Sequence, residues 1–73
     1  MTVKDLLKTS INVFGCKTGC SVRDKNDKLL GYMRADCLME SPYSNRNVNY
    51  WFIKSFNKNI NIINEIEIEV ADV

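Results

Sequence analysis

Histidine is absent from the 73-residue chain, which removes the side chain that most often acts as a general base at neutral pH. Catalysis by a Ser–His or Cys–His pair is therefore excluded, and we expect no enzyme. No apolar run approaches the roughly 18 residues needed to cross a bilayer, and none follows the N-terminus as a secretory signal. These absences predict a cytoplasmic protein without a membrane-spanning segment.

An excess of charge of one sign is also lacking, because ten Lys and Arg residues against nine Asp and Glu residues give a net charge of +1. Dedicated nucleic-acid-binding domains are usually strongly basic. The charge is nevertheless uneven along the chain. Residues 1–34 carry seven basic and three acidic side chains, or +4, whereas residues 35–73 carry three and six, or −3.

Cysteine is scarce and odd in number, with Cys16, Cys20 and Cys37. Three cysteines cannot all pair, so a disulfide framework is not expected. A structural zinc site needs four ligands, and here the fourth would have to be a carboxylate such as Asp24 or Asp36. We interpret the cysteines as small buried apolar residues and predict neither a metal nor another cofactor.

The length predicts a single domain over residues 1–73. A chain of this size buries only about 60% of the surface that its unfolded form exposes, so its core has a thin margin of stability. Small domains often add disulfides, a metal or a partner subunit. Since the first two are not expected, a protein partner, including a second copy in a homodimer, is the remaining support.

The N-terminal segment has the pattern of a short helix. Thr2 is placed as an N-cap with Asp5 three residues later, and residues 3–8 have apolar positions at helical spacing. The pattern predicts about two turns. Ile11 and Val13 then alternate with polar residues, which predicts a strand.

Further elements follow from turn residues and from alternating apolar residues. The pattern predicts a turn at Gly15–Gly19, a strand around Cys20 and Val22, a turn at Asp24–Asp27, a strand at Lys28–Arg34, a helical turn at Asp36–Glu40 and a polar loop at Tyr43–Asn47. Gly31 is compatible with a bulge or a close approach of another group to the backbone. Pro42 ends the helical turn because the residue before proline is disfavoured in the helical region.

The C-terminal third predicts a long hairpin from Val48 to Val70. Its first strand is aromatic and β-branched, Asn57–Asn59 forms the connection, and the second strand alternates apolar residues with Glu65, Glu67 and Glu69. The alternation slips at Ile63–Asn64, which predicts a bulge there. The expected fold is α+β: a short N-terminal helix packed on a small antiparallel sheet of four to five strands that ends in this hairpin.

The segment Tyr50-Trp51-Phe52 is the strongest functional signal in the sequence. On a strand, Tyr50 and Phe52 point to one face and Trp51 with Ile53 to the other. If one face packs on the helix, we expect Trp51 and Ile53 to need cover on the opposite face, from a second layer or from another chain. Trp51 belongs either to the core or to an interface, and aromatic residues and Arg dominate binding hot spots. The candidate protein-binding residues are Tyr43, Arg46, Tyr50, Trp51, Glu65, Glu67 and Glu69.

Two other patterns leave alternatives open. The three glutamates form either an acidic patch for a partner or a solvated strand face. The basic residues Lys17, Arg23, Lys25 and Lys28 are candidates for contacts with phosphates in a small nucleic-acid-binding regulator, although acidic residues interrupt them.

Several segments resemble a group of short uncharacterised proteins carried by phages and mobile elements of Gram-positive bacteria. They are the opening Met-Thr-Val-Lys-Asp-Leu-Leu, the stretch Val22–Gly31, the connection from Leu38 to Pro42, the run Asn45-Arg46-Asn47-Val48 and the alternating C-terminal strand. The resemblance implies an accessory protein of a mobile element, a class that includes small inhibitors of host defence such as anti-CRISPR proteins.

Taken together, the residues and the resemblance predict a small non-enzymatic module that binds a host protein and blocks it sterically. The alternative is the nucleic-acid-binding regulator.

Overall fold

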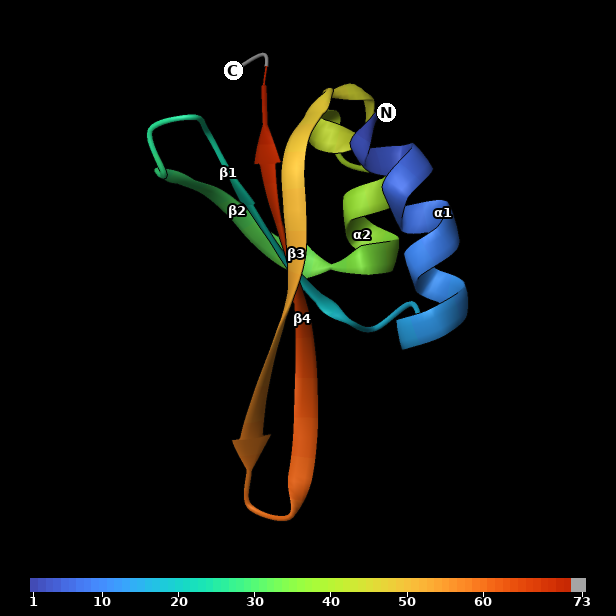
Figure 1. Cartoon of the computed structure of the whole chain (residues 1–73). Helices are drawn as coiled ribbons and strands as arrows, with labels where there is room; N and C mark the ends of the chain where they lie inside the picture. Colours follow the sequence, from blue (N-terminus) through green and yellow to red (C-terminus); the bar gives the residue numbers. More distant parts are fainter. Residues whose placement is uncertain (72–73) are drawn as a thin grey trace.

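The computed structural model describes residues 1–71, apart from the side chain of Lys58. Within these residues the chain forms two α-helices, one 3-10 helix and four strands (Figure 1). In chain order they are α1 (Val3–Phe14), β1 (Gly19–Arg23), β2 (Leu29–Arg34), α2 (Ala35–Met39), η1 (Pro42–Asn45), β3 (Val48–Lys58) and β4 (Asn61–Val70). The predicted α+β class, with its N-terminal helix on a sheet and its C-terminal hairpin, is confirmed.

The sheet is mixed rather than wholly antiparallel. Its strands lie in the order β2-β1-β4-β3, and β1 runs parallel to β4 while the other two pairs are antiparallel. β4 takes an inner position because Ile66, Ile68 and Val70 all point to one face and need cover. The alternation of apolar residues within each strand does not indicate which strands become neighbours in the sheet. The parallel pairing of β1 with β4 was therefore not predictable from it.

Helix α1 is longer than predicted, and the expected strand at Ile11 and Val13 was wrong. The predicted capping box is present, since Thr2 and Asp5 each accept a hydrogen bond from the other's backbone N–H. Ile11 continues the apolar stripe of the helix and packs against the core, while Val13 is 70% exposed on the outer side. A few alternating apolar and polar residues are compatible with both a strand and a helix, and here the packing of Ile11 against the core favours the helix.

The predicted turn residues occupy the connections. Gly15 ends α1 with a φ of 92° and donates to the carbonyl of Ile11 at 2.9 Å. Asp24 closes the β1–β2 hairpin by accepting from the backbone N–H groups of Asn26 and Lys28 at 2.8 and 3.0 Å. The segment Tyr43–Asn47, predicted as a loop, begins instead within η1, whose N-cap is Ser41.

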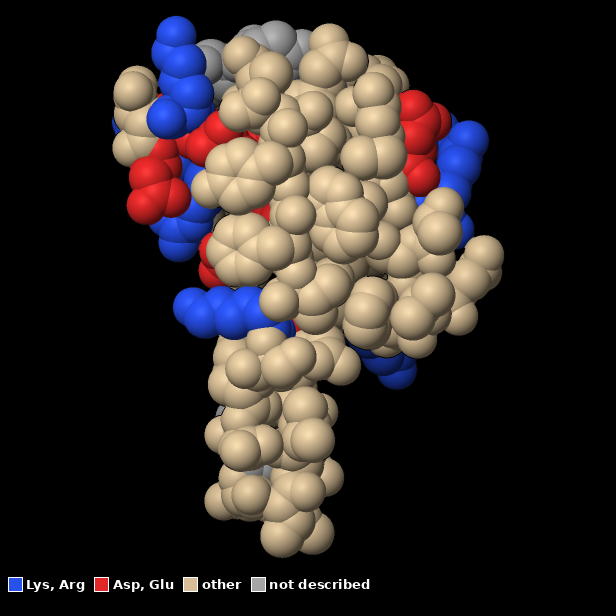
Figure 2. Space-filling view, viewed as in Figure 1, with Lys and Arg blue, Asp and Glu red and all other residues tan. Residues whose placement is uncertain are grey.

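The β3–β4 hairpin is confirmed, but two of its details differ from the prediction. Its turn lies at Asn59 and Ile60, where Asn59 has a φ of 59°. The irregularity lies between Val48 and Tyr50, whereas Ile63 and Asn64 pair regularly with β3. The end of the hairpin projects beyond the helices (Figure 1) and stands away from the body of the molecule in the space-filling view (Figure 2), so no core there imposes an alternation of apolar residues.

Both helices cover the same face of the sheet (Figure 1), and the core lies between them and the two inner strands. The largest fully buried side chains are Leu7, Leu38, Ile66, Ile68, Val3, Val22, Val70 and Cys20. No helix formed by residues 1–71 covers the opposite face, and we call it the open face. By strand alternation it presents Ser21 and Arg23, Tyr32, Tyr50, Phe52 and Lys54, and the glutamates of β4.

Replacing Leu7 by alanine tests how much of the stability depends on the contact between α1 and the sheet. Leu7 is fully buried, so Leu7→Ala leaves a cavity and lowers the free energy of unfolding by about 3 kcal/mol. Urea denaturation measures the change. The matched control is Ile60→Ala at a residue that is 98% exposed, which leaves the stability unchanged. Equal losses in both variants would contradict this account of the core.

Candidate functional site: a hollow on the open face

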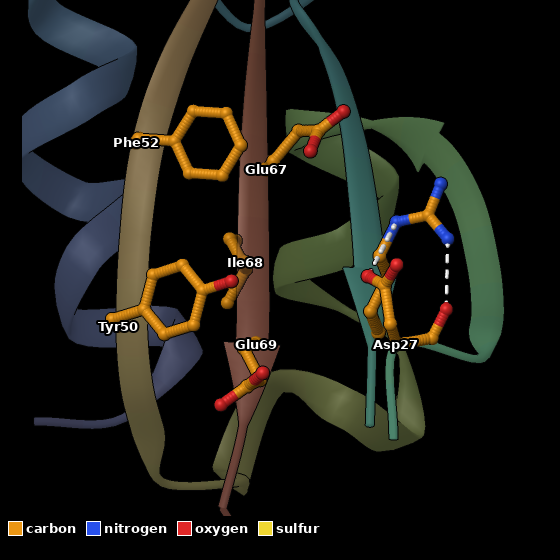
Figure 3. Close-up of a pocket in the computed structure, with 7 residues that line it drawn as sticks. Asp27, Tyr50, Phe52, Glu67, Ile68 and Glu69 are labelled. Atoms are coloured by element: carbon orange, nitrogen blue, oxygen red, sulfur yellow. Dashed lines mark hydrogen bonds and ion pairs between the residues drawn. The ribbon is translucent and has the colours of Figure 1, made fainter. Parts of the chain in front are cut away.

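The open face holds a hollow of about 220 Å³ beside two aromatic rings. Tyr50 and Phe52 stack with ring centroids 6.2 Å apart and an angle of 11° between the rings. Figure 3 shows the rings extending from β3 over β4, beside Glu67 and Glu69. The residues that line the hollow are Arg23, Asp27, Tyr50, Phe52, Glu67, Ile68 and Glu69.

The far wall of the hollow is held by the β1–β2 hairpin. Arg23 donates from Nη1 to the backbone carbonyl of Asp27 at 3.1 Å, and its Nε lies 3.8 Å from the Asp27 carboxylate. Asp27 adopts a φ of 65°, a left-handed conformation that Asp tolerates in turns. The guanidinium is thus turned back onto its own hairpin, and its charge is balanced locally.

Each glutamate of the predicted row has a partner. The Tyr32 hydroxyl donates to Glu65, Asn49 Nδ2 donates to Glu69, and the Lys54 ammonium lies 3.8 Å from Glu67. The hydrogen bond to Glu65 raises the pKa of the Tyr32 phenol above its ordinary range. The row is therefore a half-buried, partnered feature of the sheet rather than an evenly solvated face.

The carboxylates of Glu67 and Glu69 lie next to the stacked rings, and this combination favours a cation. Aromatic faces attract ammonium and guanidinium groups, and carboxylates accept charge-assisted hydrogen bonds from them. With Asp27 included, three carboxylates and one guanidinium line the hollow, a net charge of −2. The site therefore fits a basic side chain better than an anion.

The structure divides the predicted protein-binding residues between two faces. Tyr50 and the glutamates share the open face, whereas Trp51 points to the helix side and is 41% exposed. The expectation that Trp51 and Ile53 need cover on the face opposite the helix was therefore wrong, because both alternate in phase with the buried Ile66 and Ile68 of β4. Tyr43 also lies on the helix side, where its ring approaches Gly31 and its hydroxyl donates to the carbonyl of Leu30 at 3.2 Å. Arg46 follows η1, and its carbonyl accepts from Val3.

The basic residues predicted to contact nucleic acid do not form one patch. Lys25 lies in the β1–β2 turn with Lys28 just beyond it, whereas Lys17 precedes β1 at the other end of the strand. A five-residue strand separates the two ends by about 15 Å. Arg23 is held by Asp27 in the wall of the hollow.

Sequence reasoning left Phe52, Asp27 and Tyr32 out of the protein-binding set. The signal for Phe52 was available, because it lies two residues from Tyr50 and shares its face. Tyr32 could not be found this way. It contacts Glu65 across β1, and the spacing of residues in the sequence does not give the order of the strands in the sheet.

No protein-family model, curated protein or solved structure matches the chain. Among residues 1–71, no helix has the length and apolar character that a membrane span requires. The geometry of the open face therefore carries the functional argument.

Of the three cysteines, all within the described residues, Cys20 alone is buried, while Cys16 and Cys37 are exposed. The interpretation of all three as buried apolar residues was thus right only for Cys20. Burial, together with the smaller effect of the Glu65 charge, raises the pKa of the Cys20 thiol to about 12.

Native alkylation distinguishes these thiols. At pH 8 a thiol of pKa 12 is ionised in about one molecule in ten thousand, so Cys20 stays unmodified while Cys16 and Cys37 react with iodoacetamide. Mass spectrometry of the intact and digested protein counts and locates the adducts. Unfolding in urea exposes all three thiols and serves as the control. Rapid labelling of Cys20 in the folded protein would contradict its placement in the core.

The hydrogen bond between Tyr32 and Glu65 depends on Gly19, and a double-mutant cycle tests this. A Cβ at residue 19 would overlap the Tyr32 hydroxyl and come within 3.0 Å of Glu65 Oε2. Gly19→Ala therefore displaces the hydroxyl at the end of the exposed Tyr32 side chain and lowers the free energy of unfolding by about 1 kcal/mol, through loss of the hydrogen bond. In a Tyr32→Phe background the same change costs less, because the hydroxyl is already gone. Equal costs in the two backgrounds, measured by urea denaturation, would show that the contact is not made.

Proposed function

We infer that the protein is a non-enzymatic binding module that acts in the cytoplasm by occupying a basic surface of a host protein. The open face docks on the partner, and a Lys or Arg side chain of the partner enters the hollow. Occupation of this surface blocks whatever the partner would otherwise bind there. The observation that carries the proposal is the pair of stacked rings, Tyr50 and Phe52, beside the carboxylates of Glu67 and Glu69.

The exposed apolar surface supports a protein partner. Tyr50 is 52% exposed and Phe52 is 44% exposed, although both project from a strand whose neighbour is part of the core. A fully covered aromatic residue buries about 150–250 Å², of which roughly half is still exposed in each of these two, and aromatic residues are enriched at binding hot spots. Covering the two rings therefore supplies a large apolar contribution at the centre of an interface.

The charges support a basic partner. A cation over an aromatic face contributes about 1–2 kcal/mol when it is desolvated, and a hydrogen bond from a cation to a carboxylate contributes about 1.5–3 kcal/mol. The Lys54 ammonium already lies 3.8 Å from Glu67, but the Lys54 side chain is 57% exposed, and an ion pair of this length with an exposed partner is weak. A partner's guanidinium or ammonium that reaches the hollow therefore competes successfully for Glu67.

The resemblance to mobile-element proteins makes a host protein the natural target. A basic groove that binds nucleic acid presents the Lys and Arg side chains that the hollow favours. Three free cysteines are in keeping with a reducing cytoplasm. An inhibitor of this kind competes with nucleic acid for the groove of its target.

Affinity measurements on two variants test the hollow. Glu67→Gln/Glu69→Gln keeps the shapes of the side chains but removes both charges, and Phe52→Leu keeps apolar bulk but removes the aromatic face. Each change costs at least about 1.4 kcal/mol, which is a tenfold loss of affinity. The partner is captured from a lysate of a Gram-positive host, identified by mass spectrometry, purified and titrated calorimetrically against each variant.

The control variant is Val13→Ser, which removes an exposed apolar side chain from α1 on the opposite side of the molecule. Its affinity stays at the level of the unmodified protein, and thermal melting verifies that all variants are folded. The proposal fails if the purified partner binds the charge-neutral variant as tightly as the unmodified protein.

A further inference from the structure

Strand β3 is an outer strand of the sheet, and most of its outer edge is open. Met1 covers only the beginning of this edge, where its carbonyl accepts from the backbone N–H of Val48 at 2.8 Å and Thr2 bridges to Asn47. Beyond that point, no strand among the described residues pairs with β3 on the side away from β4. From Tyr50 to Phe56 the backbone groups of this side face solvent.

The open stretch from Tyr50 to Phe56 has one of the features that usually prevent pairing with another chain, the charge of Lys54. Natural edge strands are kept short, charged, interrupted by proline or covered by a loop. The stretch from Tyr50 to Phe56 has no proline, and its one charge is Lys54. The other outer strand, β2, is shorter, and the hydroxyl of Tyr43 hydrogen-bonds to its Leu30 carbonyl.

Exposed aromatic residues are concentrated on the same strand. Besides Tyr50 and Phe52, Trp51 is 41% exposed and Phe56 is 38% exposed. Three of these four residues point to the open face and Trp51 points to the helix side, so a partner that lies on the open face leaves Trp51 uncovered. A strand added at the edge flanks both sets at once.

We propose that two copies of the chain pair edge to edge through antiparallel β3 strands, with a two-fold axis at Ile53. A two-fold axis perpendicular to the sheet keeps each face of the sheet continuous, so residues that oppose one another share a face. The register of the pair is defined by the residue that lies on the axis. Three residues near the centre of the open edge are candidates: Phe52, Ile53 and Lys54.

The axis at Ile53 is the register that suits the side chains. It pairs Tyr50 with Phe56 of the second copy on the open face, Lys54 with Phe52 of the second copy, and Trp51 with Ser55 of the second copy on the helix side. Aromatic pairs and a cation over an aromatic ring both stabilise cross-strand neighbours. These pairs use the whole open stretch from Tyr50 to Phe56.

The two neighbouring registers are less favourable. An axis at Lys54 places two ammonium groups directly opposite each other, which is destabilising. An axis at Phe52 places Phe56 of the second copy opposite Val48, where Met1 already occupies the edge. The distribution of charge and the N-terminal residues therefore select Ile53.

The dimer has a consequence for the hollow, although it does not depend on the function proposed above. Because the axis is perpendicular to the sheet, the open faces of both copies point in the same direction. The two hollows then lie on one continuous surface, and a partner with two basic sites gains avidity from binding both.

Sedimentation and disulfide cross-linking test the proposal. The unmodified protein shifts from its monomer mass of 8.4 kDa towards twice that mass as its concentration rises from micromolar to millimolar. The single tryptophan, Trp51, moves its emission to shorter wavelength over the same range as it leaves water. A protein that stays monomeric with unchanged Trp51 emission overturns the proposal and leaves the edge to a different chain.

Cross-linking determines the register in a background with all three natural cysteines replaced by serine or alanine. Ile53→Cys forms an intermolecular disulfide with oxidised glutathione, since residues on the axis oppose their own copies at Cβ distances of about 5 Å. The matched control is Ser55→Cys on the same face of the same strand, whose two copies lie about 14 Å apart along the strands and do not cross-link. Cross-linking at residue 55 but not at residue 53 overturns the register. Glu67→Gln/Glu69→Gln leaves dimerisation unchanged, so the hollow and the edge are tested separately.

Discussion

The parallel contact between β1 and β4 organises the molecule. It aligns Cys20 with Ile66 and Val22 with Ile68, and these four buried side chains form the floor on which both helices pack. The contact joins the two hairpins, which are far apart in the sequence, into one sheet. Each hairpin alone is a two-stranded unit of marginal stability, and the shared core makes them one structure.

The same contact creates the open face, because a strand that buries every second residue presents the others on its opposite side. Glu65, Glu67 and Glu69 alternate with the buried residues of β4; the neighbouring strand β3 supplies Asn49 and Lys54 as partners of Glu69 and Glu67. The Tyr32 hydroxyl reaches Glu65 from β2, across β1, in the space that Gly19 leaves. The two glutamates of the hollow are thus held by a strand whose other side packs in the core, whereas Asp27 comes from the β1–β2 turn.

Strand β3 contributes to two separate surfaces, the hollow on the open face and the outer edge of the sheet. Its side chains Tyr50 and Phe52 line the hollow, while its outer backbone edge stays free for another strand. A domain of 73 residues has a small core. The exposure of four aromatic residues on β3 further reduces the apolar area that the single chain buries. Such exposure is typical of surfaces that are covered in an assembly.

The sequence by itself determined the local elements: the capping box of α1, the turn at Asp24–Asp27, the hairpin from Val48 to Val70 and the alternation that separates the glutamates from the isoleucines. Each of these depends on residues close together in the chain, whose spacing reports the backbone conformation directly. The tertiary structure decided the length of α1, the place of the hairpin turn and bulge, and the neighbour of each strand. It also decided that Arg23 and Asp27 line the same hollow as the rings of Tyr50 and Phe52. Those features depend on which apolar faces cover one another, and the free energy of that packing belongs to the whole fold rather than to any segment.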